Sequence, residues 1–317
     1  MNLELPDEAV QFGATAEKAL TALGGVDLAR DAEREREPDI RLAKVGNAID
    51  SLGADQLDPR VDIETAAAAG ELCRVAGRLA IPYPVVAVLL RDPVDLLPFA
   101  LVPDDRCRAD HGDLFSEWRV AAPGGQQAVA MPAGSRFGSK LGPFVTDLTP
   151  TGEWQGTAPG DVALHLTLTS WRILGTTERS LELAIDHVGE RVQFGQPLSA
   201  FQAVQFQLAD AAVGTDGLRE LCHFTLWRLF ADPDAGLADA LALRLHAVDT
   251  ARAVLRTSQQ LHGAAGLCDE YDVSVLARHV QPDLRLPFGS ERTSAELVEA
   301  VSRLGFASLF PQGGLDP

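Results

Sequence analysis

The sequence predicts a mostly α-helical protein with a small β region between two helical parts. Apolar residues recur at helical spacing in the N-terminal third, and short apolar runs alternate with Asp, Gly and Pro from Pro98 to Trp154. Beyond Gly160 the pattern is helical almost to the end. We therefore expect three domains: an N-terminal helical domain (1–97), a reduced middle β domain (98–157) and a C-terminal helical bundle (158–317).

In the N-terminal part, the apolar spacing of Ala9–Leu23 predicts one helix. The charge-dense stretch Asp31–Asp39 is typical of a solvated helix face or a connection. The stretch Ile63–Ala80 predicts a strong helix, and Asp62 precedes it as an N-cap. Proline at positions 82 and 84 then interrupts the pattern before the apolar run Val85–Leu90.

The remaining elements follow from the same periodicities. Four short runs separated by turn residues predict the strands of the β region: FALV, EWRVAA, QQAVAM and GPFVTDL. Five helical segments predict an antiparallel bundle: Asp161–Glu190, Ser199–Phe230 with Ser199 as its cap, Asp234–Leu261, Tyr271–Val280 and Ser294–Leu304.

Composition excludes several classes of function. With 27 basic and 45 acidic residues, the net charge of −18 argues against nucleic acid or a membrane surface as the main partner. The chain shows neither an apolar run long enough to cross a membrane nor a leader-like N-terminus. The four cysteines (Cys73, Cys107, Cys222 and Cys268) are widely spaced, so we expect buried thiols in a reducing cytoplasm, without a disulfide framework or a metal site.

Two segments in the bundle carry recognisable chemistry. Residues 191–202 place an arginine, amides and a glycine turn between two long helices, an arrangement suited to an anion or a nucleotide. A surface salt bridge of Arg191 is the alternative. Residues 260–266 (QLHGAAG) put small residues after a helix end, where a backbone or a flat ligand can approach closely.

Together these motifs resemble those of the acyl-CoA dehydrogenase family, whose order of helical, β and bundle domains is the same. The resemblance implies that an R-x-x-F-G loop and a Q-x-x-G-G-x-G loop hold the adenosine diphosphate half of FAD, usually in a neighbouring subunit's site. Arg191, Phe194, Gly195 and, further on, Gln202 match the first motif; Gln260, Gly263 and Gly266 match the second, with Ala264 replacing a glycine. The resemblance implies these cofactor-binding residues: Arg191, Gln193, Phe194, Gln202, Gln260, Gly263 and Ala264.

The departures concern the catalytic centre. The family uses a glutamate to remove the α-proton of an acyl-CoA while FAD takes the β-hydride. Its usual position falls on Pro287, and the position used by a subset of members falls on His165. Glu291 and Glu296 lie near the first position, but using either requires an insertion. The T/S-E-P-x-x-G-S-D-like segment that lines the flavin ring is missing from the β region.

This combination resembles the short subunit of the heterotetrameric acyl-CoA dehydrogenases of actinobacterial steroid breakdown. In that branch a longer subunit supplies the glutamate and the flavin-ring pocket of an α2β2 assembly, and the substrate is a bulky, steroid-derived acyl-CoA. We therefore expect no catalytic residue in this chain, a longer partner, and FAD as the shared cofactor. Two alternatives stay open: a self-sufficient enzyme with His165 or Glu291 as base, and a flavin-free scaffold of the same fold.

Overall fold

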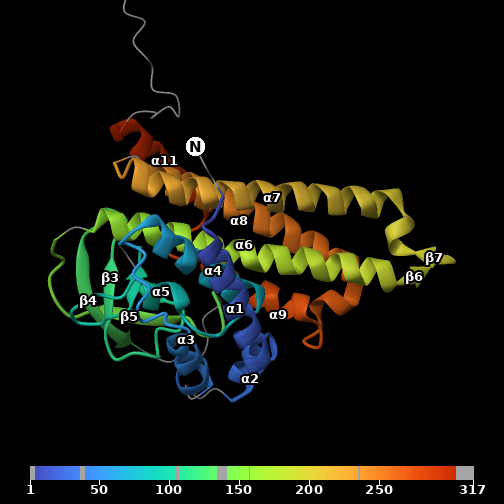
Figure 1. The fold of residues 1–317 in the computed structure, drawn as a ribbon, viewed down its shortest axis with the longest axis horizontal. Helices are drawn as coiled ribbons and strands as arrows, with labels where there is room; N and C mark the ends of the chain where they lie inside the picture. The colour runs from blue at the N-terminus through green and yellow to red at the C-terminus, as the bar shows by residue number, and fades with distance from the viewer. Residues whose placement is uncertain are drawn as a thin grey trace, which may run out of the picture.

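The protein is described here by a computed structural model that covers residues 4–35, 40–103, 107–133, 141–156, 158–234 and 236–304. The end of the charge-dense stretch (36–39) and the end of the expected bundle domain (305–317) lie outside the described residues. The fold class is as predicted: helices predominate, and one small sheet lies at one end of a long helical bundle (Figure 1).

The N-terminal part is helical, as expected. Its elements are α1 (Asp7–Leu23), α2 (Asp27–Glu35), a π-helical turn (Ile40–Gly46), α3 (Asn47–Ser51), α4 (Ile63–Arg78) and α5 (Val85–Leu89). The predicted cap is confirmed, because the Asp62 carboxylate accepts a hydrogen bond from the Thr65 amide at 2.7 Å. On α2, Leu28, Ala29 and Ala32 are buried and Arg34 and Glu35 are exposed. Glu33 instead accepts hydrogen bonds from Arg278 and pairs with His279, so the charge-dense stretch is a solvated face only in part.

In the described part of the β region, five strands form one sheet in the order β1-β3-β4-β5-β2. Its strands are β1 (Phe99–Leu101), β2 (Arg108–Ala109), β3 (Trp118–Ala121), β4 (Gln127–Ala133) and β5 (Thr146–Pro150). Only β1 and β3 pair in parallel; the other pairs are antiparallel. The fully buried Trp118 anchors the sheet and donates its indole N–H to the Gly112 carbonyl at 3.0 Å.

The bundle is built from α6 (Pro159–Glu190), α7 (Gln202–Ala231), α8 (Gly236–His262) and α11 (Ser290–Leu304). Figure 1 shows α6, α7 and α8 side by side, with the sheet near the start of α6 and the β6–β7 hairpin at the opposite end. The connections are β6 (Val192–Gln193), β7 (Gln196–Pro197), 3-10 turns at Leu198–Ala200 and Gly263–Leu267, α9 (Asp272–His279) and α10 (Gln281–Arg285). In the described ranges, no helix combines the length and the apolar character needed to cross a membrane.

One hydrophobic core joins the three parts of the chain. It contains side chains from α1 and α4, from β1, and from the bundle helices α6, α7, α8 and α11. A smaller cluster lies under the sheet around Trp118 and Val120. The sheet is therefore attached to the bundle through a shared interior rather than through a linker.

Two predictions were wrong in detail. Ser199 does not cap the second bundle helix: a 3-10 turn and the extended residue Phe201 precede α7, which begins at Gln202. Phe201 lies edge-to-face against Phe194 of the hairpin, with ring centroids 6.3 Å apart. Of the four cysteines, only Cys73 and Cys222 are buried; Cys107 is half-buried and Cys268 is exposed.

Candidate functional site

The first motif forms a tight hairpin at the far end of the bundle. Val192 pairs with Pro197 and Gln193 with Gln196, which leaves a two-residue turn of Phe194 and Gly195. Both turn residues have positive φ, 52° and 82°, the conformation that a type I′ turn requires. The turn holds Phe194 in the open, with 91% of its surface exposed. An exposed aromatic ring on a strained turn is typical of a contact site.

The charged and amide groups of this motif surround the hairpin. Arg191 is the residue that ends α6, and its side chain is exposed. Gln193 is exposed on β6, and Gln202 is exposed at the first position of α7. A guanidinium and two amides therefore flank the start of a long helix, where backbone N–H groups favour an anion.

The second motif turns the chain directly after α8. Gly263 has φ 63°, which accounts for the glycine, whereas a Cβ on Gly266 would lie 2.6 Å from the Gln259 carbonyl oxygen. Gln260 and Ala264 are exposed. Position 264 lies in a 3-10 turn and is not among the described residues with positive φ, so alanine is accommodated there.

A pair of stacked imidazoles brings the two motifs together. His187, one turn before Arg191 on α6, and His262, at the end of α8, have ring centroids 4.4 Å apart and an interplanar angle of 21°. The two loops are therefore neighbours at the same end of the bundle, as a shared nucleotide contact requires. Sequence analysis missed this pair. It could have been suggested by the position of the two histidines, each in the last turn of a helix that we expected in the bundle.

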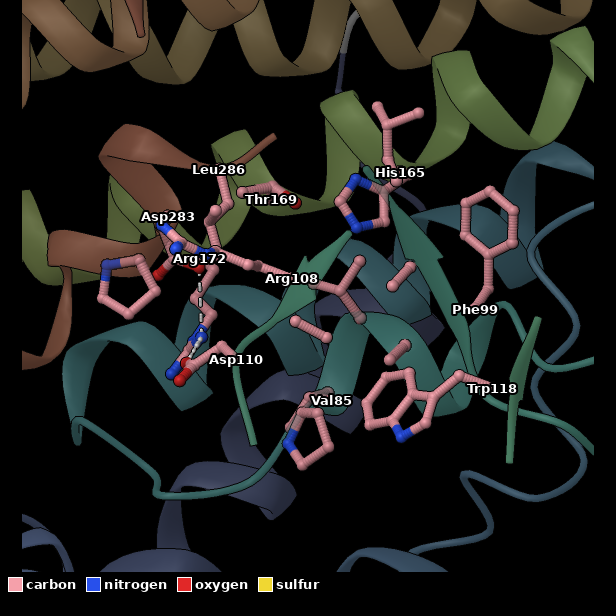
Figure 2. Close-up of a pocket in the computed structure, with 17 residues that line it drawn as sticks. Val85, Phe99, Arg108, Asp110, Trp118, His165, Thr169, Arg172, Asp283 and Leu286 are labelled. Atoms are coloured by element: carbon pink, nitrogen blue, oxygen red, sulfur yellow. Dashed lines mark hydrogen bonds and ion pairs between the residues drawn. The ribbon is translucent and has the colours of Figure 1, made fainter. Parts of the chain in front are cut away.

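A cavity lies near the other end of α6, between the N-terminal helices, the sheet and α10 (Figure 2). Its volume is about 70 Å³. Phe99 and Trp118 form one side, and the polar side chains of Asp110, Arg172 and Asp283 form the other. The two positions at which a family base is expected converge here, because His165 lines the cavity and Leu286, beside the buried Pro287, lines it as well.

Neither position provides an effective base. Pro287 has no group that can accept a proton. Burial, reinforced by the charge of Arg244, lowers the pKa of His165 to about 3, and its Nδ1 has no hydrogen-bond partner. An imidazole with so low a pKa abstracts protons poorly near neutral pH. Glu291 and Glu296 lie on α11 and are not among the described residues that line the cavity.

Ion pairs occupy the polar side of the cavity. The Arg172 guanidinium lies 3.1 Å from Asp283 and 3.8 Å from Asp110, and it also donates to the Ile81 carbonyl at 3.3 Å. Burial raises the pKa of Asp110 to about 7 and also raises that of Asp283, against the attraction of Arg172. One guanidinium between two half-buried carboxyls thus occupies the polar side of the cavity. Sequence analysis missed this cluster, although an arginine within an apolar helix signals a buried partner.

The two regions differ in their fit to FAD. Binding pockets for ligands of drug size measure about 300–1,000 Å³, so the cavity at His165 holds neither a flavin ring nor a thioester beside it. The residues of the two loops fit the other half of the cofactor, because an exposed guanidinium, exposed amides and two glycine turns suit a diphosphate and a flat base.

Comparison with known families agrees with this geometry. Residues 167–299 match the family described as the C-terminal domain of acyl-CoA dehydrogenase. This match lies within the bundle and includes both motifs. Residues 167–299 are therefore similar to an acyl-CoA dehydrogenase C-terminal domain, and the chain as a whole has the acyl-CoA dehydrogenase fold.

Curated relatives match over part of their length. Probable acyl-CoA dehydrogenase YngJ of Bacillus subtilis is 33% identical over 106 residues, which are 33% of this chain and 27% of that protein. Benzylmalonyl-CoA dehydrogenase of Aromatoleum aromaticum is 30% identical over 144 residues, 44% of this chain and 38% of that protein. The matched region thus spans between about a quarter and two fifths of these relatives.

Solved structures match the fold over nearly the whole chain. The ChsE4-ChsE5 complex from Mycobacterium tuberculosis contains a chain with a TM-score of 0.75 at 16% identity, covering 97% of this chain and 100% of that chain. The Tcur3481-Tcur3483 steroid ACAD G363A variant gives a TM-score of 0.73 at 18% identity, covering 94% of this chain and 98% of that one.

Proposed function

We propose that this chain is a subunit of an FAD-dependent acyl-CoA dehydrogenase and that it holds the adenosine diphosphate end of the cofactor. A longer acyl-CoA dehydrogenase subunit supplies the catalytic base and the flavin-ring pocket, and two copies of each chain form an α2β2 assembly in the cytoplasm. When bound, FAD accepts the hydride released during α,β-desaturation of the acyl-CoA.

The distance along α6 is the observation that carries this proposal. Thr169 lines the cavity, and Arg191 follows it at the other end of the same helix, about 30 Å away at 1.5 Å per residue. One dinucleotide does not reach from that cavity to the hairpin of the same chain. The exposed loops therefore serve a flavin that another subunit holds, while the chain's own centre is closed by Arg172, Asp110 and Asp283.

Each loop residue has a role in this proposal. Arg191 pairs with the diphosphate, and Gln193 and Gln202 donate to neighbouring polar groups of the nucleotide. The exposed ring of Phe194 packs against the adenine or the flavin edge. Gln260 and the backbone at Gly263 and Ala264 close over the adenosine.

The substrate class is part of the same proposal. We assign a bulky, steroid-derived acyl-CoA, because an assembly in which only one kind of subunit builds a flavin site leaves room for a polycyclic group. The structural similarity to chains of two hetero-complexes, one of them named a steroid ACAD, supports this assignment.

Visible absorption spectra test the proposal directly. The chain is purified alone and then together with the proposed longer subunit. We expect no flavin colour on the isolated chain and about half a flavin per chain in the complex, as two sites in four chains require. A full equivalent of flavin on the isolated chain means that it builds its own site, with His165 as the residue to examine.

The matched variants are Arg191→Ala and Arg34→Ala. Removing one charge-assisted contact weakens FAD retention by the complex by about 1.5–3 kcal/mol, roughly ten- to a hundredfold. Arg34 is exposed on α2, so its replacement changes the net charge equally without this loss. Equal FAD affinity in both variants refutes the assignment of Arg191, and a complex without flavin supports the scaffold alternative.

A further inference from the structure

The two stacked imidazoles near the loops differ in their hydrogen bonding: His262 has a fixed tautomer, and His187 is the ring stacked on it. The Nδ1–H of His262 donates to the Ser258 carbonyl at 2.7 Å, because a carbonyl can only accept, and this bond fixes its tautomer. The Ser258 hydroxyl donates to the Ser180 carbonyl at 2.8 Å and ties α8 to α6. His262 is thus a rigid platform on which the ring of His187 lies.

Several charged and titratable groups surround His187. Burial, His262 on α8 and Arg191 on α6 lower the pKa of His187, whereas Glu190 on α6 opposes them. Tyr271, just before α9, packs edge-to-face against the ring of His262, with ring centroids 6.3 Å apart. His187 lies in the last turn of α6, and a helix C-terminus favours a cation. Without a bound anion, neutral His187 prevails near neutral pH.

We propose that His187 is a second, proton-coupled contact to the diphosphate that Arg191 binds. This inference rests on the proposed function and deepens it. His187 lies one turn before Arg191, the residue that ends α6, and the charge of Arg191 acts on the His187 ring. A diphosphate held by the guanidinium therefore brings negative charge close to the imidazole. The anion then favours the imidazolium, and His187 takes up a proton as the nucleotide binds.

The direction of the pH effect follows from linkage. If the nucleotide strengthens proton binding at His187, protonation strengthens nucleotide binding by the same factor. Affinity therefore rises as the pH falls, and the full gain is about tenfold for each unit by which the anion raises the pKa of His187. Only one proton is taken up, because two imidazolium rings 4.4 Å apart would repel each other.

ADP-ribose is the probe for this coupling. Its diphosphate is esterified at both ends and carries no group that titrates in this range, unlike the terminal phosphate of ADP. Calorimetry at pH 6, 7 and 8, in two buffers of different ionisation heat, measures both affinity and proton uptake. The flavin-free complex with the longer subunit and the full chain alone are both measured.

Three variants separate the possible outcomes. We expect His187→Gln and His187→Phe to bind as the unmodified chain does at pH 8 and to lose the gain at pH 6; the phenylalanine keeps a ring in the stack. The control is His246→Gln, at an exposed site on α8 about four turns before His262. We expect this variant to keep the gain in affinity at pH 6. Affinity that does not change with pH, or a gain that persists in both His187 variants, overturns the inference while leaving the role of Arg191 intact. ADP-ribose binding that Arg191→Ala does not weaken, or no binding to either preparation, refutes the proposed function as well.

Discussion

His165 is a half-buried imidazole that lines the cavity. Its ring packs edge-to-face against Phe99, with centroids 5.7 Å apart, and its buried Nδ1 has no partner. Burial, together with the positive charge of Arg244, lowers its pKa to about 3. In the unfolded chain the same imidazole has a pKa of about 6.5. The free energy of unfolding therefore depends on pH through His165.

Replacing His165 by phenylalanine tests this link. The pKa of His165 is lower in the folded chain than in the unfolded chain. The contribution of neutral His165 to the free energy of unfolding is therefore present above about pH 6.5 and is lost as the pH falls from there toward 3. The loss reaches about 1.4 kcal/mol per pH unit. In urea titrations between pH 7 and pH 4.5, we expect the free energy of unfolding of His165→Phe to fall less steeply than that of the unmodified chain.

The cavity beside His165 accommodates the larger ring, so the variant is expected to fold. His246→Gln, at an exposed position, serves as the control and should keep the original slope. Equal slopes in all three proteins would show that His165 is solvated and charged, and would make it available again as a catalytic base.

At the scale of elements, α4 and α6 cross so closely that their backbones touch. A Cβ on Gly175 would lie 1.8 Å from the Arg74 carbonyl oxygen, and one on Gly77 would lie 1.9 Å from the Arg172 carbonyl oxygen. The Thr176 hydroxyl bridges the crossing by donating to the Gly77 carbonyl at 3.0 Å. The crossing fixes how the N-terminal helices sit on the bundle, and hence the walls of the cavity.

Gly175→Ala forces this crossing apart. Because the obstructing atoms belong to a helix backbone rather than to a flexible side chain, we expect a loss of about 3 kcal/mol or more in the free energy of unfolding. The matched control is Gly189→Ala on the same helix, where a Cβ meets open space. There, alanine should leave stability unchanged or raise it by up to about 1 kcal/mol. Similar effects of the two substitutions would mean that α4 does not lie against α6 as described.

The elements were predictable where a pattern is local. Helical spacing predicted α1, α4, α6 and α8 to within a few residues, and the alternation of short runs with turns predicted the sheet. The start of α7 was not predicted, because a 3-10 turn and the extended residue Phe201 follow the hairpin before the helix begins. The short helix α10 and the crossing at Gly175 depend on tertiary packing, which periodicity does not record.

The candidate site divides in the same way. The candidates Arg191, Phe194 and Gln260 could be proposed from motifs, since the residues of each loop are close together in the sequence. The ion-pair cluster in the cavity could not be predicted. Its members, Asp110, Arg172 and Asp283, come from the β region, α6 and α10 and meet only in the folded chain. The stack of His187 on His262 likewise joins the ends of two helices that are distant in sequence.

At the scale of the whole molecule, the three expected domains share their interior. The main core combines Leu20 and Leu72 from the N-terminal helices with Phe99 from the sheet and Trp171 from the bundle. Ion pairs cross the same boundaries: Arg74 reaches Glu178 at 2.8 Å, and Arg119 of β3 reaches Asp161 of α6 at 2.7 Å. A bundle separated from residues 1–97 would expose the apolar face that α4 covers.

Such sharing predicts one cooperative unfolding transition. Because the loss of any part uncovers the core of the others, a calorimetric scan of the full chain should show a single peak, with circular dichroism and tryptophan fluorescence changing together. Gly175→Ala should move that peak to lower temperature without splitting it. Two separated transitions, or a protease-resistant bundle that remains after the first, would instead give residues 158–317 independent stability and make the N-terminal part an accessory to the loops that we assign to FAD.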